Sequence, residues 1–130
     1  MIKRKDMLGL IDATAEEISE ILDTAANMKK LLKQGIKKLP HLEGCTATIL
    51  FYENSTRTRT SFELAAKYMG ASTINIAASS SSVAKGETLI DTGKTLDAMK
   101  NDFIIIRHPM GGAPYLLAKT VKASVLNAGD

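Results

Sequence analysis

The chain has 130 residues, of which 45% are hydrophobic and 24% charged, and its formal net charge is +3. This composition is typical of one globular domain with a core, and the single cysteine, Cys45, excludes an internal disulfide. No long apolar run follows the basic N-terminus, so we expect neither a signal peptide nor a membrane span, and a cytoplasmic location follows by default. Many lysines lie before residue 39 with no aromatic residue among them, which favours a solvated surface over a nucleic-acid-binding arm.

Helical and strand patterns alternate along the chain. Thr14 and Glu17 form a capping-box pattern, and the apolar stripe that follows at helical spacing, as far as Gly35, is expected to pack in the core. Strands are predicted at residues 46–52, 72–76, 102–106 and 124–126, and helices between them at 56–69, 87–100 and 113–119. This alternation predicts one α/β domain over residues 1–130, with a parallel four-stranded sheet covered by helices on both faces.

The most informative stretch is residues 51–63, where the first strand meets a helix. The first turn of a helix has unpaired N–H groups and the positive end of the helix dipole, and both favour an anion. Here that turn carries three hydroxyl donors and a planar guanidinium, from Ser55, Thr56, Thr58 and Arg57. A capping serine beside solvated arginines is the alternative interpretation. Arginines oppose the dipole at this end of a helix, however, so we favour a phosphate site.

Four polar clusters each follow the end of a predicted strand. They are residues 55–59, 79–85, 107–108 and 127–130. In an open parallel sheet the loops after the strands gather at one edge, and ligands bind there. The order of the elements therefore predicts a site for a small anion at the carboxyl edge of the sheet.

Several of these blocks resemble the aspartate and ornithine carbamoyltransferases. They are Ser55-Thr-Arg-Thr-Arg59 with Ser61-Phe-Glu63, Lys85-Gly-Glu-Thr88 with Asp91-Thr92, Arg107-His-Pro109, and Asn127-Ala-Gly-Asp130. The second and third look like the aspartate branch in particular. The resemblance implies a carbamoyl-phosphate-binding domain and indicates no metal or organic cofactor. The sequence stops at Asp130, where the family continues into a second domain that binds aspartate, so we expect an isolated first domain.

The resemblance also implies a role for each site residue. Attack of an amine on carbamoyl phosphate forms a tetrahedral oxyanion and releases phosphate. This reaction requires charge stabilisation and positioning more than a nucleophilic residue of the protein. Phosphate would be held by Ser55, Thr56, Arg57 and Thr58, while Thr58 and Arg107 would face the carbonyl oxygen. Lys85 and a serine, either Ser81 or Ser82, would reach the site of a neighbouring subunit in a homotrimer. The resemblance thus implies four catalytic residues, namely Arg57, Thr58, Arg107 and Lys85.

Other polar residues receive structural interpretations. For Arg107 the alternative is a strand-end arginine that extends to water. His108 and Glu63 are not expected to be catalytic, and Glu53 and Asn54 are expected to shape the turn between strand and helix.

Two functions of different classes follow. The first is half of a transferase that carbamoylates L-aspartate, giving N-carbamoyl-L-aspartate and phosphate in pyrimidine biosynthesis, with the isolated domain inactive or weakly active. The second is a catalytically silent module that binds a phosphate ligand or self-associates. Within the family, ornithine carbamoyltransferase is the alternative, because the residues that select the amino acid would lie in the second domain.

Overall fold

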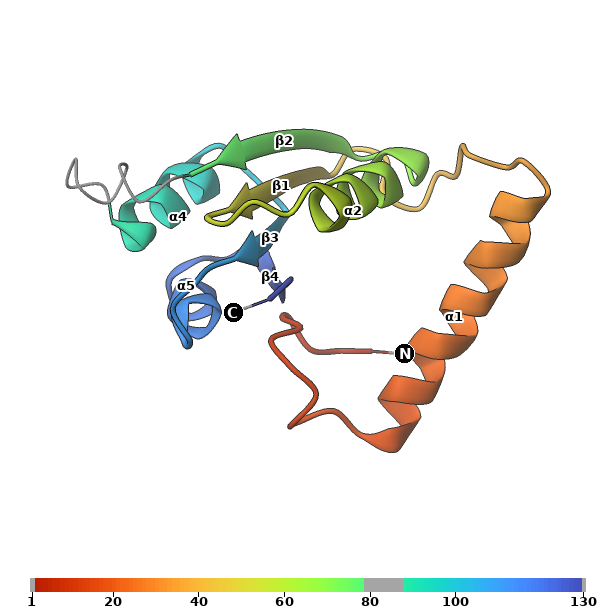
Figure 1. Ribbon diagram of the computed structural model, residues 1–130, viewed down its shortest axis with the longest axis horizontal. Helices are drawn as coiled ribbons and strands as arrows, with labels where there is room; N and C mark the ends of the chain where they lie inside the picture. Colours follow the sequence, from red (N-terminus) through yellow and green to blue (C-terminus); the bar gives the residue numbers. More distant parts are fainter. Residues whose placement is uncertain (1, 79–87, 130) are drawn as a thin grey trace.

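The computed structural model describes residues 2–78 and 88–129, and it confirms the predicted α/β alternation. In chain order the elements are α1 (Ala15–Lys33), β1 (Thr46–Phe51), α2 (Thr56–Tyr68), β2 (Ser72–Ala77), α4 (Leu89–Ala98), β3 (Phe103–Arg107), α5 (Ala113–Thr120) and β4 (Ser124–Asn127). The four strands of the described residues form one sheet in the order β2-β1-β3-β4, and every pair is parallel (Figure 1). Ser81, Ser82 and Lys85 lie outside the described residues.

Helices pack on both faces of this sheet, as predicted. On one face, Leu50 of β1 and Ile104 of β3 join a buried cluster with Leu96 of α4 and Leu117 of α5. On the other face, Ile49, Phe51 and Ile105 form a second cluster against Phe62 of α2. Neighbouring strand residues such as Ile104 and Ile105 therefore face different helices, because side chains alternate across a strand.

The strand order places a topological switch point between β1 and β3. The chain passes from β1 through α2 to β2 on one side, and then crosses back through α4 to β3 on the other side of β1. Such a reversal opens a crevice at the carboxyl ends of the two central strands, which is where open α/β sheets bind ligands. The residues that follow β1 and β3 thus occupy the favoured position for a site.

Gly93 in α4 has a packing role. A glycine in the middle of a helix normally weakens it. In the structure, a Cβ atom at Gly93 would lie 2.7 Å from Cδ1 of Leu117 and 2.9 Å from Cγ1 of Val121, on and just after α5. The glycine therefore allows α4 and α5 to lie close together on the sheet.

The prediction for α1 is half right. Its capping box forms as expected, but none of its residues is buried, and the helix stands apart from the sheet (Figure 1). Leu22 is 63% exposed and Leu32 47% exposed, so the expectation that the apolar stripe packs in the core is wrong. Helical periodicity reveals that one face of a helix is apolar, but not what covers that face.

The helices in the described residues are also too short or too polar to cross a membrane.

Candidate anion site at the carboxyl edge of the sheet

Backbone hydrogen bonds continue past the strand ends and hold the loops of this edge together. The N–H of Tyr52, after β1, donates to the carbonyl of Arg107 at 2.8 Å. The N–H of His108, after β3, donates to the carbonyl of Gly129 at 3.2 Å. The loops after β1, β3 and β4 therefore meet at one edge, as the sequence predicts, whereas the cluster at residues 79–85 lies outside the described residues.

The N-terminal end of α2 presents its polar groups without using them internally. Ser55 occupies the N-cap position, but its hydroxyl makes no capping hydrogen bond, and the first turn contains no acidic residue. Thr56 and Arg57 are exposed, and Thr58 is half-buried. None of these side chains has a hydrogen-bond or ion-pair partner among the described residues. The turn therefore offers unpaired donors and a positive charge to an anion.

The two arginines of the motif point to different environments. Arg57 is exposed, whereas the guanidinium carbon of Arg59 lies 5.7 Å from the ring centroid of Phe51. The Nε atom of Arg59 is buried and has no hydrogen-bond partner among the described residues. Residues two apart on a helix do not share a face, and the aromatic ring partly compensates the charge of Arg59. Arg57 is thus the arginine available to a ligand at the end of α2.

Arg107, the last residue of β3, is held in place from two directions. Its Nε atom donates to Oε2 of Glu53 at 3.3 Å, and its Nη1 atom donates to the carbonyl of Ala128 at 3.4 Å. Its side chain is 31% exposed. These contacts favour a held guanidinium over one that extends freely into water. The Nη2 atom has no partner among the described residues and can donate to a ligand.

Glu53 is the site residue that sequence reasoning missed. The sequence predicts only that it shapes the turn after β1, yet its carboxylate reaches across the edge to Arg107, 54 residues later. A carboxylate beside an arginine holds the guanidinium and competes with an anionic ligand for it. A carboxylate directly before an arginine-rich helix end was the available signal, but its partner is distant in sequence.

His108 and Glu63 are both engaged in contacts with neighbouring groups. The ring centroid of His108 lies 4.5 Å from that of Tyr52, and its Nδ1 accepts a hydrogen bond from the N–H of Met110 at 3.0 Å. Burial lowers the pKa of His108, although the charge of Glu53 opposes this shift. Glu63 binds Lys67 at 3.0 Å, and this contact lowers the pKa of its carboxyl. Neither group is placed as a free base beside the end of α2.

A separate cavity of about 320 Å³ lies between β1, β2 and α4. Its wall includes Leu50, Tyr52, Ile76, Leu96 and Met99, and none of its described lining residues is charged. A phosphate group would lose its hydration there without finding a cation. The described lining of this cavity therefore does not fit an anion, whereas the unpaired donors at the end of α2 do.

Comparison with known proteins identifies the family. The model of the "Aspartate/ornithine carbamoyltransferase, carbamoyl-P binding domain" family matches residues 5–130. The chain belongs to this family. The aspartate carbamoyltransferase catalytic subunit of Ruminiclostridium cellulolyticum is 67% identical over 129 residues, which are 99% of this chain and 41% of the relative. That of Acetivibrio thermocellus is 64% identical over 130 residues, which are 100% of this chain and 42% of the relative.

Solved structures of carbamoyltransferases have the same fold. The catalytic subunit of M. jannaschii aspartate transcarbamoylase superposes with a TM-score of 0.86 at 42% identity, over 98% of this chain and 41% of that one. Aspartate transcarbamoylase from Trypanosoma cruzi, in complex with carbamoyl phosphate, gives a TM-score of 0.87 at 34% identity, over 98% of this chain and 39% of that one. The chain thus spans about two fifths of the length of these relatives.

Proposed function

We propose that this chain is the carbamoyl-phosphate-binding half of an aspartate carbamoyltransferase of the cytoplasm. The complete enzyme transfers the carbamoyl group to L-aspartate and releases N-carbamoyl-L-aspartate and phosphate, a step of pyrimidine biosynthesis. One observation carries the proposal: the uncapped N-terminal end of α2 and the guanidinium of Arg107 lie at the switch point of the sheet. Family membership and the names of the relatives support the choice of ligand.

The residues of this edge divide between the two ends of the ligand. The phosphate group binds the free N–H groups of the first turn of α2, the hydroxyls of Ser55, Thr56 and Thr58, and the guanidinium of Arg57. The carbonyl oxygen lies toward Arg107 and Thr58. Both phosphate and carbonyl oxygen accept hydrogen bonds, so a row of donors along the edge fits both.

The reaction then requires no nucleophilic side chain. The amine nitrogen of aspartate attacks the carbonyl carbon, and the carbonyl oxygen becomes an oxyanion that Arg107 and Thr58 stabilise. The oxyanion then re-forms the carbonyl as the bond between the carbon and the bridging oxygen breaks. Phosphate leaves with the electron pair of that bond, takes up the proton that the attacking nitrogen loses, and is still held by the end of α2. Donors fixed before the reaction stabilise this charge without reorganisation, and loss of one donor typically lowers the rate by a factor on the order of 100 or more.

Two parts of the proposal lie beyond the described residues. We place Lys85 and either Ser81 or Ser82 in the site of a neighbouring subunit, which makes the assembly a homotrimer. Aspartate binding is assigned to a second domain, in the part of the relatives that this chain does not span. Residues 1–130 are then one carbamoyl-phosphate domain, and we expect it to be inactive or weakly active by itself.

Calorimetric titration of carbamoyl phosphate tests the proposal. The unaltered chain should bind, and Arg57→Ala should weaken binding by a factor on the order of 100, because it removes a bidentate charged contact. Lys94→Ala, which removes an exposed positive charge from α4, is the matched control and should bind normally. Formation of N-carbamoyl-L-aspartate when aspartate is added would exclude the catalytically silent module, whereas binding without turnover agrees with both functions. Absence of binding to the unaltered chain would refute a carbamoyl-phosphate half-site.

The ornithine alternative is less well supported. The relatives named above are aspartate carbamoyltransferases, and the Lys85-Gly-Glu-Thr88 and Arg107-His-Pro109 blocks resemble that branch. If the chain turns over at all, N-carbamoyl-aspartate should form and citrulline should not when both amino acids are present.

A further inference from the structure

A short turn at residues 127–129, where β4 ends, contacts the guanidinium of Arg107. The side chain of Asn127 closes this turn, because its Oδ1 atom accepts a hydrogen bond from the N–H of Gly129 at 2.9 Å. The carbonyl of Ala128, between the two, accepts from Nη1 of Arg107 at 3.4 Å. The side chain of Asn127 therefore fixes the turn that presents this carbonyl to the arginine.

Gly129 leaves the space that the guanidinium occupies. Its φ of +134° lies in a region that other residues rarely adopt, and a Cβ atom there would lie 3.2 Å from Nη1 of Arg107. Its carbonyl also accepts the N–H of His108. The backbone of residues 128–129 thus contacts Arg107 directly, with no side chain between them.

The N-terminal segment binds the amide nitrogen of the Asn127 side chain. Its Nδ2 atom donates to the carbonyl of Leu8 at 3.0 Å. Residues 5–8 run beside β4: Met7 pairs with Leu126 as a parallel bridge, and the N–H of Asn127 donates to the carbonyl of Met7 at 2.9 Å.

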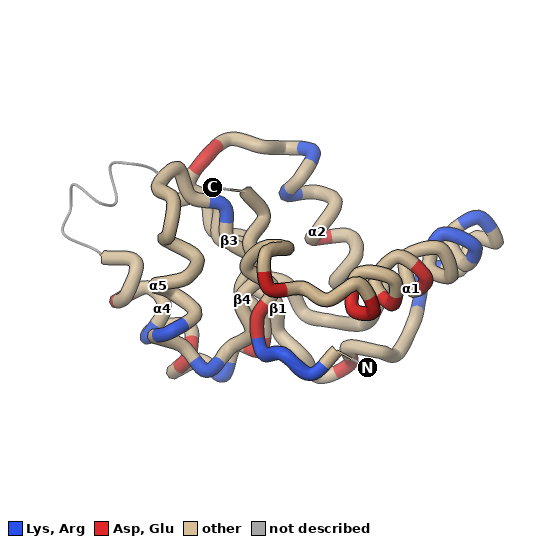
Figure 2. Tube along the Cα trace, turned by 90° about the horizontal axis from the view of Figure 1, so that it is seen from below, with Lys and Arg blue, Asp and Glu red and all other residues tan. Residues whose placement is uncertain are grey.

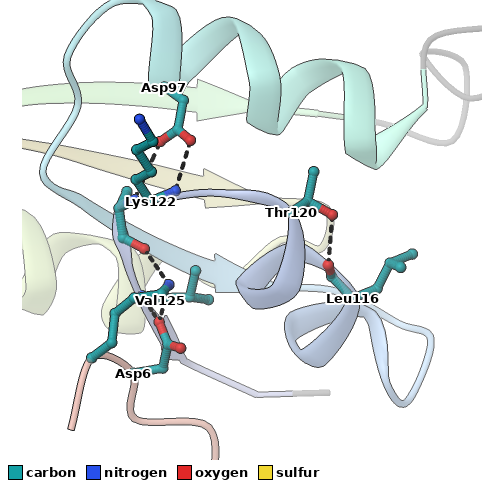
Figure 3. A network of polar contacts seen from close by, with 8 residues as sticks. Asp6, Asp97, Leu116, Thr120, Lys122 and Val125 are labelled. Carbon is teal, nitrogen blue, oxygen red and sulfur yellow. Dashed lines mark hydrogen bonds and ion pairs between the residues drawn. The ribbon is translucent and has the colours of Figure 1, made fainter.

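A side-chain contact fixes the same segment further along β4. Oδ1 of Asp6 accepts the N–H of Val125 at 2.8 Å (Figure 3). The carbonyl of Leu8 is therefore a fixed acceptor, and both polar atoms of the Asn127 amide are engaged.

We propose that Asn127 is a positioning residue for Arg107, and that residues 5–8 act on the site through it. This inference rests on the proposed function, in which Arg107 binds the carbonyl oxygen of carbamoyl phosphate. Asn127 touches no ligand; it determines where the carbonyl of Ala128 holds the guanidinium. Its loss should therefore weaken recognition of the carbamoyl end of the ligand and spare recognition of the phosphate end, which the N-terminal end of α2 supplies without contact to Asn127.

Comparing carbamoyl phosphate with inorganic phosphate isolates this effect. Both ligands are titrated into the unaltered chain, Asn127→Ala, Arg107→Ala and the double variant. Asn127→Ala should weaken carbamoyl phosphate about tenfold, through two lost hydrogen bonds, and leave phosphate binding within about twofold. In the Arg107→Ala background the second substitution should have no further effect, because the positioned group is absent. Equal weakening of both ligands, or additive effects, would overturn the inference.

Two variants separate positioning from general loss of structure. Asn127→Asp retains an acceptor for the N–H of Gly129 but loses the donor to Leu8, so it should restore part of the discrimination between the two ligands. It also serves as the test variant if Asn127→Ala does not fold. Asn75→Ala removes a side-chain hydrogen bond of 2.9 Å to Glu63. Asn75 lies in β2, the outer strand on the side of the sheet away from β4, so this variant should leave both affinities unchanged.

A measurement without ligand distinguishes failure of this inference from failure of the proposed function. The Nε–H signal of Arg107 in a ¹⁵N NMR spectrum is assigned by its loss in Arg107→Ala. Asn127→Ala should shift this signal, and Asn75→Ala should not. If the unaltered chain binds neither ligand but the signal shifts, the proposed function fails and the positioning role stands. An unmoved signal refutes the positioning role.

Discussion

Helices α1 and α2 both begin with a hydroxyl residue at the N-cap position, but only α1 satisfies N–H groups of its first turn with its own side chains. At α1, Oγ1 of Thr14 accepts the N–H of Glu17 at 3.1 Å, and Oε1 of Glu17 accepts the N–H of Thr14 at 3.0 Å. Glu16 and Glu17 place negative charge in the first turn, and Arg4 binds the carboxylate of Glu17 at 2.7 Å. Figure 2 shows the acidic residues of α1 near its start and basic residues toward its other end, the arrangement that complements a helix dipole.

At α2 the same position is left open. Ser55 stands where Thr14 stands in α1, but it makes no capping hydrogen bond, and Thr58 replaces the glutamate of a capping box. The first turn carries Arg57 and no acidic residue. The difference shows what a helix end can be used for: when its own side chains satisfy the N–H groups it stabilises the fold, and when they do not it can bind an anion.

Converting the end of α2 into one like α1 should produce the largest effect. Thr58→Glu completes a capping box with Ser55 and places a negative charge where the phosphate would bind. We expect carbamoyl phosphate binding to fall by a factor on the order of 100 or more, and the free energy of unfolding to rise by about 0.5 kcal/mol. Calorimetric titration and chemical denaturation measure the two effects.

Thr60→Glu is the matched control for this change. It adds the same charge to the same helix at an exposed residue beyond the first turn, where the dipole has little effect. Its binding should be reduced much less. If Thr58→Glu binds as well as the unaltered chain, the end of α2 is not the phosphate site.

Opening the end of α1 should affect stability alone. Thr14→Ala removes the cap, which typically costs about 1 kcal/mol, or roughly fivefold in an opening equilibrium. Because no residue of α1 is buried, this loss should appear as faster amide hydrogen exchange within α1, while carbamoyl phosphate binding stays unchanged. Thr24→Ala, at an exposed interior position of α1, should slow exchange slightly, since alanine is the better helix former. Equal exchange in both variants would contradict a functional cap.

The features that the sequence predicts well are local in sequence. Strand and helix periods, the capping box of Thr14 and the unusual first turn of α2 each arise within a few neighbouring residues. The convergence of Arg107 with the end of α2 also follows, because parallel strands share a carboxyl edge. The elements differ from their predicted bounds by about one or two residues, because helix and strand ends depend on contacts that periodicity does not reveal.

The features that sequence reasoning missed depend on distant partners. Glu53 is paired with a residue 54 positions later, and Asn127 with one 119 positions earlier. The N-terminal residues 5–8 join β4 through a single bridge, which produces no periodicity that the sequence could reveal. The apolar stripe of α1 is the converse case, since its pattern is strong but none of its residues is fully buried in the part of the chain that the structure describes.

The smallest predicted effect is the loss, at low pH, of a contact that stabilises the N-terminal end of α1. The side-chain contact with Arg4 lowers the pKa of Glu17 from 4.5 to about 2. A carboxyl whose pKa is lower in the folded state stabilises the fold fully above pH 4.5, and this contribution is lost as pH falls from 4.5 to about 2.

Following α1 by NMR during thermal unfolding should show this loss. The difference in the midpoint temperature of unfolding between the unaltered chain and Glu17→Gln should become smaller as pH falls from 4.5 to about 2. Glu16→Gln, in the same turn but without the contact to Arg4, should show a smaller pH dependence, and added salt should reduce the effect of Glu17 because the pair is partly accessible to solvent. A difference that persists unchanged down to pH 2 would mean that the ion pair with Arg4 does not help to close this helix end.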